Sequence, residues 1–363
     1  MKVLLVSVVA AVAAFRLIAQ PTEVDPALKT YQTVKVAEGI YAFISPESKA
    51  PLVSGNCTAV IGEDGVLVVD SGHFPSLTRR MIGEIRQMTD KPVRYLVNTH
   101  WHADHVTGNN VYREVFPNVI IMSTPDTQER LAKPLPQYDD RTQITQAVPV
   151  IEEILRSGKS RNGAPLSDDA RRYYEIMLND GKYALAEFQQ PKPAPPTLTF
   201  ERAIKVNLGN REVEIRFLGR GHSAGDAVVY VPDSRVLITG DLLVNPIPYA
   251  YGSFIEEWIA TLKELSNYDA TAIIPGHGPV ERDKLYLQQV VALLETLTNQ
   301  VHAGVKEGLD LEQVRSKVDF ADFKEKMAGN DYFRGRAFDD RFVRPGVERA
   351  YREAKEGKLK DEN

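Results

Sequence analysis

The chain has 363 residues, enough for one large domain or two smaller ones, and 43% of them are hydrophobic, as expected for a sizeable core. Its 44 basic and 49 acidic residues give a formal net charge of −5 without a basic stripe, which excludes nucleic acid as an expected partner. The single cysteine, Cys57, excludes an intramolecular disulfide. We expect Cys57 to be a small buried hydrophobic residue in a strand.

The first twenty residues differ in kind from the rest of the chain. Met1-Lys2 is followed by the uncharged apolar run Val3–Phe15 and by a small residue, Ala19, at a plausible cleavage point. This pattern predicts a secretory signal peptide over residues 1–20 and export to the periplasm or out of the cell. The run is too short to span a bilayer comfortably, so we expect no stable membrane span. Because Arg16 lies close to the cleavage point, an uncleaved anchor is the alternative.

A polar segment over residues 21–36 is predicted to be an N-terminal arm. After it, short apolar runs alternate with turns, and two segments have helical spacing. The predicted strands are Gly39–Ile44, Asn56–Ile61, Val66–Asp70, Val93–Val97, Val119–Met122, Leu198–Phe200, Ala203–Leu208, Glu212–Leu218, Ala227–Val231, Val236–Thr239 and Ala272–Ile274. The predicted helices are Pro75–Met88 and Phe254–Leu265. Because the order strands, helix, strand occurs twice, we predict two packed sheets with helices outside them.

Two further segments are predicted to be helical. Residues 125–196 are rich in charge and in helix formers and end in a proline cluster, which indicates an insertion that caps the cleft or enlarges the surface. Residues 286–363 are predicted to be a C-terminal extension. Helical spacing is found in Val150–Leu155, Ala170–Leu185, Leu285–Val305 and Val347–Lys358. A solvated face or a dimer contact is expected for the arginines Arg334, Arg336, Arg341, Arg344, Arg349 and Arg352, and the oligomeric state stays undefined.

Four potential metal ligands lie within six residues, directly after the predicted strand Val93–Val97. They are His100, His102, Asp104 and His105, in the pattern His-x-His-x-Asp-His. In an extended loop, His100 and His102 can reach one ion together, and Asp104 and His105 are placed to serve a second ion. Imidazole and carboxylate ligands suit zinc, and also iron or manganese. A polar loop with exposed histidines rarely has this density of ligands.

The second half of the chain offers further ligands. His222, Asp241 and His277 each follow a predicted strand and stand beside glycine, where the backbone can turn sharply. Singly, each could be a hydrogen-bonded turn residue. However, five of the seven histidines lie in these loops and only His73 and His302 do not, so we predict one two-metal site.

This ligand set resembles that of the metallo-β-lactamase-fold hydrolase superfamily, in its order and its local contexts. The segment Val66–Gly72 also resembles the early strand and aspartate turn of that family. The resemblance covers residues 37–285. It implies an α/β fold, a four-layer αββα sandwich with the metals at one edge of the sheets, here with a helical insertion and a helical C-terminal extension.

The resemblance also implies roles for the ligands. One ion would be held by His100, His102 and His222, the other by Asp104, His105 and His277, with Asp241 bridging the pair. Asp70 would support the ligand loop, or would be a purely structural aspartate at a turn. Two divalent metal ions, zinc first with iron or manganese as alternatives, would share a water and provide hydroxide near neutral pH. Asp104 would orient this water as well as bind metal.

We therefore predict a dinuclear metal-dependent hydrolase that acts on an ester, thioester, lactone or amide bond of a small molecule. An exported metallo-β-lactamase is the first alternative, and an iron-dependent oxygenase-type redox enzyme of the same fold is the second. Many metallo-β-lactamases resemble one another in carrying cysteine or serine where Asp241 stands. No lysine follows it in Leu242-Leu243-Val244. Both departures favour the broader hydrolase.

Three aromatic residues are candidates for the substrate pocket. Tyr249 and Tyr251 follow Asp241 and could hydrogen-bond an oxyanion, although ordinary packing is the simpler interpretation. Trp101 lies inside the ligand loop, and we expect it to pack under the site rather than stack on a substrate.

Overall fold

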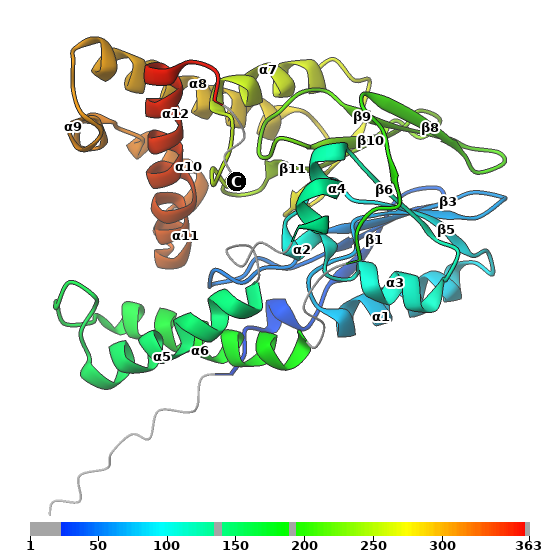
Figure 1. Cartoon of the computed structure of the whole chain (residues 1–363), viewed down its shortest axis with the longest axis horizontal. Helices are drawn as coiled ribbons and strands as arrows, with labels where there is room; N and C mark the ends of the chain where they lie inside the picture. Colours follow the sequence, from blue (N-terminus) through cyan, green and yellow to red (C-terminus); the bar gives the residue numbers. More distant parts are fainter. Residues whose placement is uncertain (1–22, 134–139, 189–193, 360–363) are drawn as a thin grey trace, which may run out of the picture.

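Two β-sheets lie face to face in the computed structural model, which describes residues 23–133, 140–188 and 194–359 (Figure 1). The signal peptide predicted over residues 1–20 lies outside the described residues. In spatial order, the first sheet contains β1 (Gln32–Ala37), β2 (Ile40–Ile44), β3 (Cys57–Ile61), β4 (Val66–Val69), β5 (Val93–Val97), β6 (Ile120–Ser123) and β7 (Leu198–Thr199). The second contains β12 (Ala272–His277), β11 (Val236–Val244), β10 (Ala227–Val231), β9 (Glu212–Phe217) and β8 (Ala203–Asn207).

The strand β4 shows how the sequence builds the layers. All four of its residues are buried, because successive side chains point to opposite faces of the sheet. Leu67 and Val69 pack in the core between the two sheets. Val66 and Val68 pack on the other face, against the helix α1 (Pro75–Met88). Burying one such side chain contributes about 1.5–3 kcal/mol, so this continuous apolar run stabilises both interfaces.

Helices cover the outer face of each sheet. On the first sheet lie α1 and α3 (Asn109–Val115), and on the second lie α7 (Ile255–Leu265) and α8 (Leu285–Lys306) (Figure 1). In α1 the apolar residues Leu77, Met81, Ile82 and Ile85 share one face and are buried against the sheet. The predicted four-layer αββα sandwich is confirmed.

The N-terminal segment differs from the prediction. We predicted an arm over residues 21–36, but Gln32–Ala37 forms β1, the edge strand of the first sheet. Val36 is buried between the sheets while Lys35 is exposed, so the strand alternates as expected for an edge. Its polar outer side chains made the segment look like an arm in the sequence.

The predicted helical insertion and C-terminal extension are both present. The insertion contains α4 (Pro125–Ala132), α5 (Asp140–Ser157) and α6 (Asp168–Glu187). The extension continues after α8 with α9 (Leu311–Lys317), α10 (Ala321–Ala328), α11 (Tyr332–Ala337), the π-helical turn η3 (Phe338–Val343) and α12 (Arg344–Glu356). The hairpin of α5 and α6 and the end of the extension around α11 lie on the same side of the sandwich (Figure 1).

A few contacts join these helices to each other and to the sandwich. Tyr173 of α6 stacks on Phe333 of α11, with ring centroids 6.4 Å apart. The carboxylate of Glu353 in α12 accepts hydrogen bonds from the backbone N–H groups of Ile255 and Glu256, at the start of α7. Within the described ranges, no helix has the length and apolar character that crossing a membrane requires.

Candidate metal centre

The first four candidate ligands follow the carboxyl end of β5. This strand lies between β4 and β6 and runs parallel to both, so loops at this end meet at one edge of the sheet. His100 and His102 lie in the loop, as expected. Asp104 and His105 were predicted to be in the same loop, but they lie in a short helix, α2 (Ala103–Val106), that begins after His102. The helical turn separates the side chains of the two pairs.

The other three candidates come from the second sheet. His222 lies in the loop between β9 and β10. Asp241 and His277 were predicted to follow strands, but β11 continues through Asp241, and His277 is the last residue of β12. The pairing of β11 with β12 shifts register around Gly240, whose φ of +52° lies in the left-handed region that glycine adopts readily. At this irregularity in the strand pairing, the side chain of Asp241 faces the other candidate ligands.

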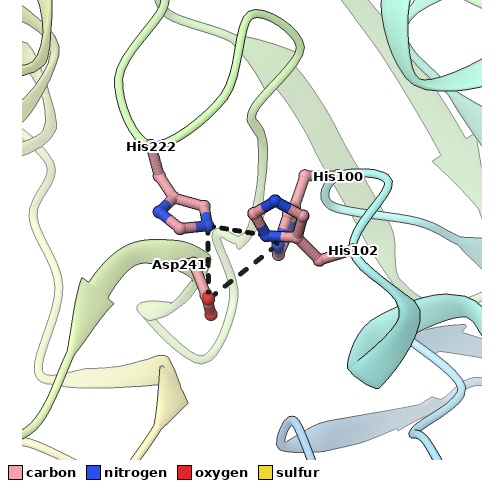
Figure 2. A group of neighbouring side chains, drawn as sticks. All are labelled: His100, His102, His222 and Asp241. Carbon is pink, nitrogen blue, oxygen red and sulfur yellow. Dashed lines mark hydrogen bonds and ion pairs between the residues drawn. The ribbon is translucent and has the colours of Figure 1, made fainter. Parts of the chain in front are cut away.

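One group of side chains contains three histidines and Asp241 (Figure 2). Nδ1 of His102 lies 3.1 Å from Nε2 of His100 and 2.8 Å from Nε2 of His222. Oδ2 of Asp241 lies 3.5 Å from Nε2 of His222 and 3.9 Å from Nε2 of His100. Four potential ligand atoms therefore surround one point.

A second group lies beside the first and shares Asp241 with it. Nε2 of His105 lies 3.3 Å from Nε2 of His277. Oδ2 of Asp104 lies 3.0 Å from the latter nitrogen and 3.5 Å from the former. The other oxygen of Asp241, Oδ1, lies 3.1 Å from Nε2 of His105 and 3.6 Å from Nε2 of His277. Asp241 thus presents one oxygen to each group.

The chemistry of these atoms fits two metal ions. Ligands at about 2.0–2.1 Å from a tetrahedral zinc ion lie roughly 3.3 Å from one another, which is close to the spacings in both groups. Oδ1 of Asp241 is buried and has no hydrogen-bond partner among the described residues, as expected for an atom that a cation would satisfy. The seven predicted residues could therefore hold two ions, three histidines on one side and two histidines with Asp104 on the other.

The electrostatics of the two groups differ. Burial lowers the pKa of His102 to about 3, so its imidazole is neutral and its lone pair is available to a metal. Burial opposes the charged form of His105 too, but the carboxylates of Asp241, Asp104 and Asp70 outweigh this effect and raise its pKa well above the ordinary value. The second group therefore has the stronger negative field, which a cation would neutralise.

Asp70 orients the ligand loop. Its Oδ2 lies 2.9 Å from Nδ1 of His105, and its two oxygens accept hydrogen bonds from the backbone N–H and the hydroxyl of Thr99. Asp70 adopts a φ of +58°, a left-handed conformation that aspartate tolerates better than most residues. The structure therefore brings Asp70 to the place where the resemblance put a support for the loop.

Other histidines are oriented by neighbouring oxygens. Nδ1 of His222 lies 2.9 Å from the carbonyl oxygen of Tyr249, and Nδ1 of His100 lies 3.0 Å from the hydroxyl oxygen of Thr99. Such partners fix the ring orientation and the tautomer of a histidine ligand. In both residues the nitrogen that faces the cluster is Nε2.

Close backbone approach also shapes the site. A Cβ atom at Gly276 would lie 1.9 Å from Oδ1 of Asp241, and a Cβ atom at Gly55 would lie 2.4 Å from Cε1 of His105. Real side chains cannot occupy these positions. Glycine is therefore required where β12 and the segment before β3 pass the ligands.

A cavity of about 620 Å³ opens onto the ligand cluster. Its wall on the insertion side is mainly apolar and is formed by Ile144, Val148 and Ile151 of α5 and Met177 of α6. On the extension side lie the basic residues Arg341 and Arg349 together with the two predicted tyrosines. The cavity therefore combines an apolar wall with a polar and basic one beside the candidate metals.

The three predicted pocket residues all line this cavity, in different ways. Trp101 packs beside the site, with its ring 4.2 Å from that of His102 and the guanidinium of Arg130 5.1 Å from its centroid. Tyr251 is 50% exposed, and its hydroxyl donates to the carbonyl oxygen of Asp340 at 3.0 Å. Burial raises the pKa of Tyr249 to about 12, against the opposing effect of a nearby guanidinium.

That guanidinium belongs to Arg341, which was predicted to lie on a solvated face or at a dimer contact. Instead, its Nη1 donates to the hydroxyl oxygen of Tyr249 at 2.8 Å, and its Nη2 donates to the carbonyl oxygen of Ala50 at 2.7 Å. Phe338 and Phe342 of the same π-helical turn are fully buried in the core, while Arg341 lines the cavity. The spacing of the two phenylalanines is visible in the sequence, but the hydrogen-bond partners of Arg341 are far from it along the chain.

Asp226 was not among the predicted site residues. Its buried carboxylate accepts hydrogen bonds from the backbone N–H and the hydroxyl of Ser223, next to His222. Burial raises the pKa of Asp226 to about 8. This residue therefore holds the loop that carries His222.

Comparisons with known proteins agree with this geometry. A linear primary-alkylsulfatase from Pseudomonas sp. (strain ATCC 19151) is 26% identical over 277 residues, which are 70% of this chain and 48% of that protein. A type 2 metallo-beta-lactamase from Bacillus cereus is 23% identical over 222 residues, which are 60% of this chain and 64% of that protein. The chain therefore spans about half to two thirds of the length of these two relatives.

Solved structures share the fold. A double mutant of the sec-alkyl sulfatase PisA1 matches with a TM-score of 0.63 at 16% identity, over 92% of this chain and 51% of that one. A metallo-beta-lactamase from Pontibacter korlensis matches with a TM-score of 0.50 at 19% identity, over 73% of this chain and 99% of that one. The model of the metallo-beta-lactamase superfamily matches residues 50–277. The chain therefore belongs to the metallo-β-lactamase superfamily.

Proposed function

We propose that the protein is a metal-dependent hydrolase of small-molecule esters, with two metal ions held by the seven clustered residues. One observation carries this proposal: Asp241 presents a separate oxygen to each of two adjacent groups of ligand atoms. A site for a single ion would not require a carboxylate in this bridging position. We propose zinc as the metal, although the same ligands accept iron or manganese.

Two bound divalent cations would supply a hydroxide nucleophile near neutral pH and would polarise the bond to be cut. The chain's own residues prepare the site for this chemistry. Asp70 and the carbonyl of Tyr249 orient His105 and His222, so the ligand atoms are in place before a substrate arrives. Asp104 lines the cavity as well as the ligand cluster, so its carboxylate can also orient the attacking water.

The cavity favours substrates with an apolar chain. Ile144, Val148 and Met177 form a wall opposite the basic residues, so an alkyl or acyl chain can lie on the insertion while its ester group faces the ligands. The similarity to a linear primary-alkylsulfatase supports sulfate esters as members of this substrate class. The similarity to metallo-beta-lactamases supports β-lactams as a second candidate, against which the aspartate at position 241 still argues.

The test is a substrate panel on purified protein with measured metal content. Carboxylic esters, thioesters, lactones and alkyl sulfates of increasing chain length, together with a chromogenic cephalosporin, are assayed with and without a chelator. We expect chelator-sensitive turnover of esters and a KM that falls as the chain lengthens. Dominant cephalosporin turnover would replace our proposal with a β-lactamase, and no hydrolysis by a protein that binds two iron ions would favour redox chemistry.

We also propose that the protein is exported, because of the signal pattern in its first twenty residues. Cell fractionation and N-terminal sequencing of the mature protein test this proposal. A chain that stays in the cytoplasm with an intact N-terminus would contradict it.

A further inference from the structure

Tyr249 serves the candidate metal centre with two different parts of the residue. Its carbonyl oxygen lies 2.9 Å from Nδ1 of His222, so its backbone orients a ligand. Its ring centroid lies 5.4 Å from that of His277, and its side chain lines the cavity together with Asp104 and Asp241. The side chain therefore stands beside the ligand cluster without being a ligand candidate itself.

The hydroxyl of Tyr249 can still donate a hydrogen bond. Its oxygen accepts a hydrogen bond from Arg341, and among the described residues its own proton has no acceptor within hydrogen-bond distance. Tyr251 provides the contrast, because its hydroxyl already donates to the carbonyl of Asp340. A tyrosine hydroxyl is both a donor and an acceptor. The proton of Tyr249 is therefore available to a group that enters the cavity.

Arg341 fixes this hydroxyl from the C-terminal extension. One of its nitrogens is bonded to Tyr249 and another to the carbonyl of Ala50, so the guanidinium is anchored on two separate segments. Its central carbon lies 5.0 Å from the centroid of the Tyr249 ring. A cation that donates to the hydroxyl oxygen polarises the O–H bond, which makes the hydroxyl a stronger donor.

We propose that Tyr249, positioned by Arg341, donates a hydrogen bond to the substrate oxygen that gains or carries negative charge beside the metal ligands. This oxygen is the carbonyl oxygen of a carboxylic ester or thioester, or a non-bridging oxygen of a sulfate ester. The proposal rests on the proposed hydrolase function and adds a catalytic residue to it. It also makes the C-terminal extension a necessary part of the active site.

The first test replaces the hydroxyl alone. A donor that stabilises a developing oxyanion typically contributes about 10²–10³-fold to kcat, so we expect Tyr249→Phe to lower kcat by about 10²-fold. We expect KM to change by less than about threefold, because the hydrogen bond strengthens mainly in the transition state. Metal content per chain should stay that of the wild type, since the backbone carbonyl that orients His222 is retained.

The matched control is Tyr230→Phe. The hydroxyl of Tyr230 donates to the carbonyl of Asp269, away from the cavity, so this variant loses the same atom without touching the site. It should keep wild-type kcat and KM. If Tyr249→Phe behaves like this control in an active enzyme, the proposal is wrong.

A double-mutant cycle tests the role of Arg341. If Arg341 acts through Tyr249, Arg341→Gln should lower kcat by about tenfold in the wild-type background. In the Tyr249→Phe background it should lower kcat by less than about twofold. A merely structural arginine would lower kcat, or the free energy of unfolding, by the same amount in both backgrounds. Full additivity would therefore overturn the positioning role.

A binding measurement separates this proposal from the proposed function. Inorganic phosphate is titrated calorimetrically into the metal-loaded wild type, Tyr249→Phe and Tyr230→Phe. We expect Tyr249→Phe alone to weaken phosphate binding, by about tenfold. If Tyr249→Phe weakens phosphate binding but the wild type hydrolyses nothing in the panel, the anion site is supported and the proposed hydrolase function is wrong. If Tyr249→Phe leaves both phosphate binding and kcat unchanged, the proposed role of Tyr249 is wrong and the hydrolase function is unaffected.

Discussion

The ligand cluster and the helical cover, which we define as residues 140–188 and 332–356, face each other across one cavity but are held in different ways. The cluster consists of two groups of largely buried polar atoms, and the atoms within each group lie within 4.8 Å of one another. They are carried by strands, loops and the short helix α2 at one edge of the two sheets. The cover is attached by apolar packing and by isolated polar contacts such as that of Glu353 with the start of α7. Small changes therefore have large effects in the cluster, whereas the cover can change its lining more freely.

The largest effect is expected in the cluster. We expect His102→Ala to abolish hydrolysis, because it removes the nitrogen that lies closest to both other histidines of the first group. Circular dichroism should show a folded chain, and metal analysis should show less than the wild-type content. The matched control is His302→Ala, since His302 is partly exposed and pairs with Glu256 outside the site. Undiminished turnover by His102→Ala would show that the cluster is not the catalytic centre.

A smaller effect is expected from the backbone beside Asp241. Because a Cβ atom at Gly276 would overlap with the carboxylate of Asp241, we expect Gly276→Ala to lower metal affinity or activity by about 10–100-fold. Competition with a metal indicator measures the affinity. As a control, Gly83→Ala in α1 adds its methyl group in open space and should stabilise the fold by up to about 1 kcal/mol. Equal metal affinity in both variants would contradict the close-contact argument.

The smallest effect is expected in the cover, as a change of stability with pH. Burial raises the pKa of Glu353 from an ordinary value of 4.5 to about 7. The folded protein therefore keeps a proton that the unfolded chain releases, so this group makes the free energy of unfolding fall as pH rises from 4.5 to 7. We expect a shallower pH dependence in Glu353→Gln, measured by urea unfolding at several pH values.

Glu356→Gln, on the exposed face of the same helix, is the control for that measurement and should keep the wild-type pH dependence. A wild-type slope in Glu353→Gln would mean that the buried carboxyl of α12 does not titrate in this window. The cover would then differ from the cluster only in its packing, without a contribution of the Glu353 carboxyl to the pH dependence of stability.

Local patterns in the sequence predicted the sandwich and the cluster well. The helix α1 begins and ends where its apolar spacing placed it, and all seven predicted ligands come together. These features depend on residues that are close along the chain or on strand ends that must meet. By contrast, Arg341 acts on Ala50 and Tyr249, and such contacts between distant segments follow from the tertiary packing of the extension. The strand β1 was missed for a related reason, since an edge strand needs only one apolar face.

Cys57 can serve as a labelling probe for opening of this fold. It is the only thiol in the chain and lies buried in β3, between β2 and β4, and burial raises its pKa well above the ordinary value. Its side chain packs among the residues that join the first sheet to α1. Since only an exposed thiolate reacts readily with an alkylating reagent, each labelling event would record an opening of this sheet–helix packing. The ratio of labelling rates with and without metal would then report how much bound ions stabilise the fold against this opening, without any substrate.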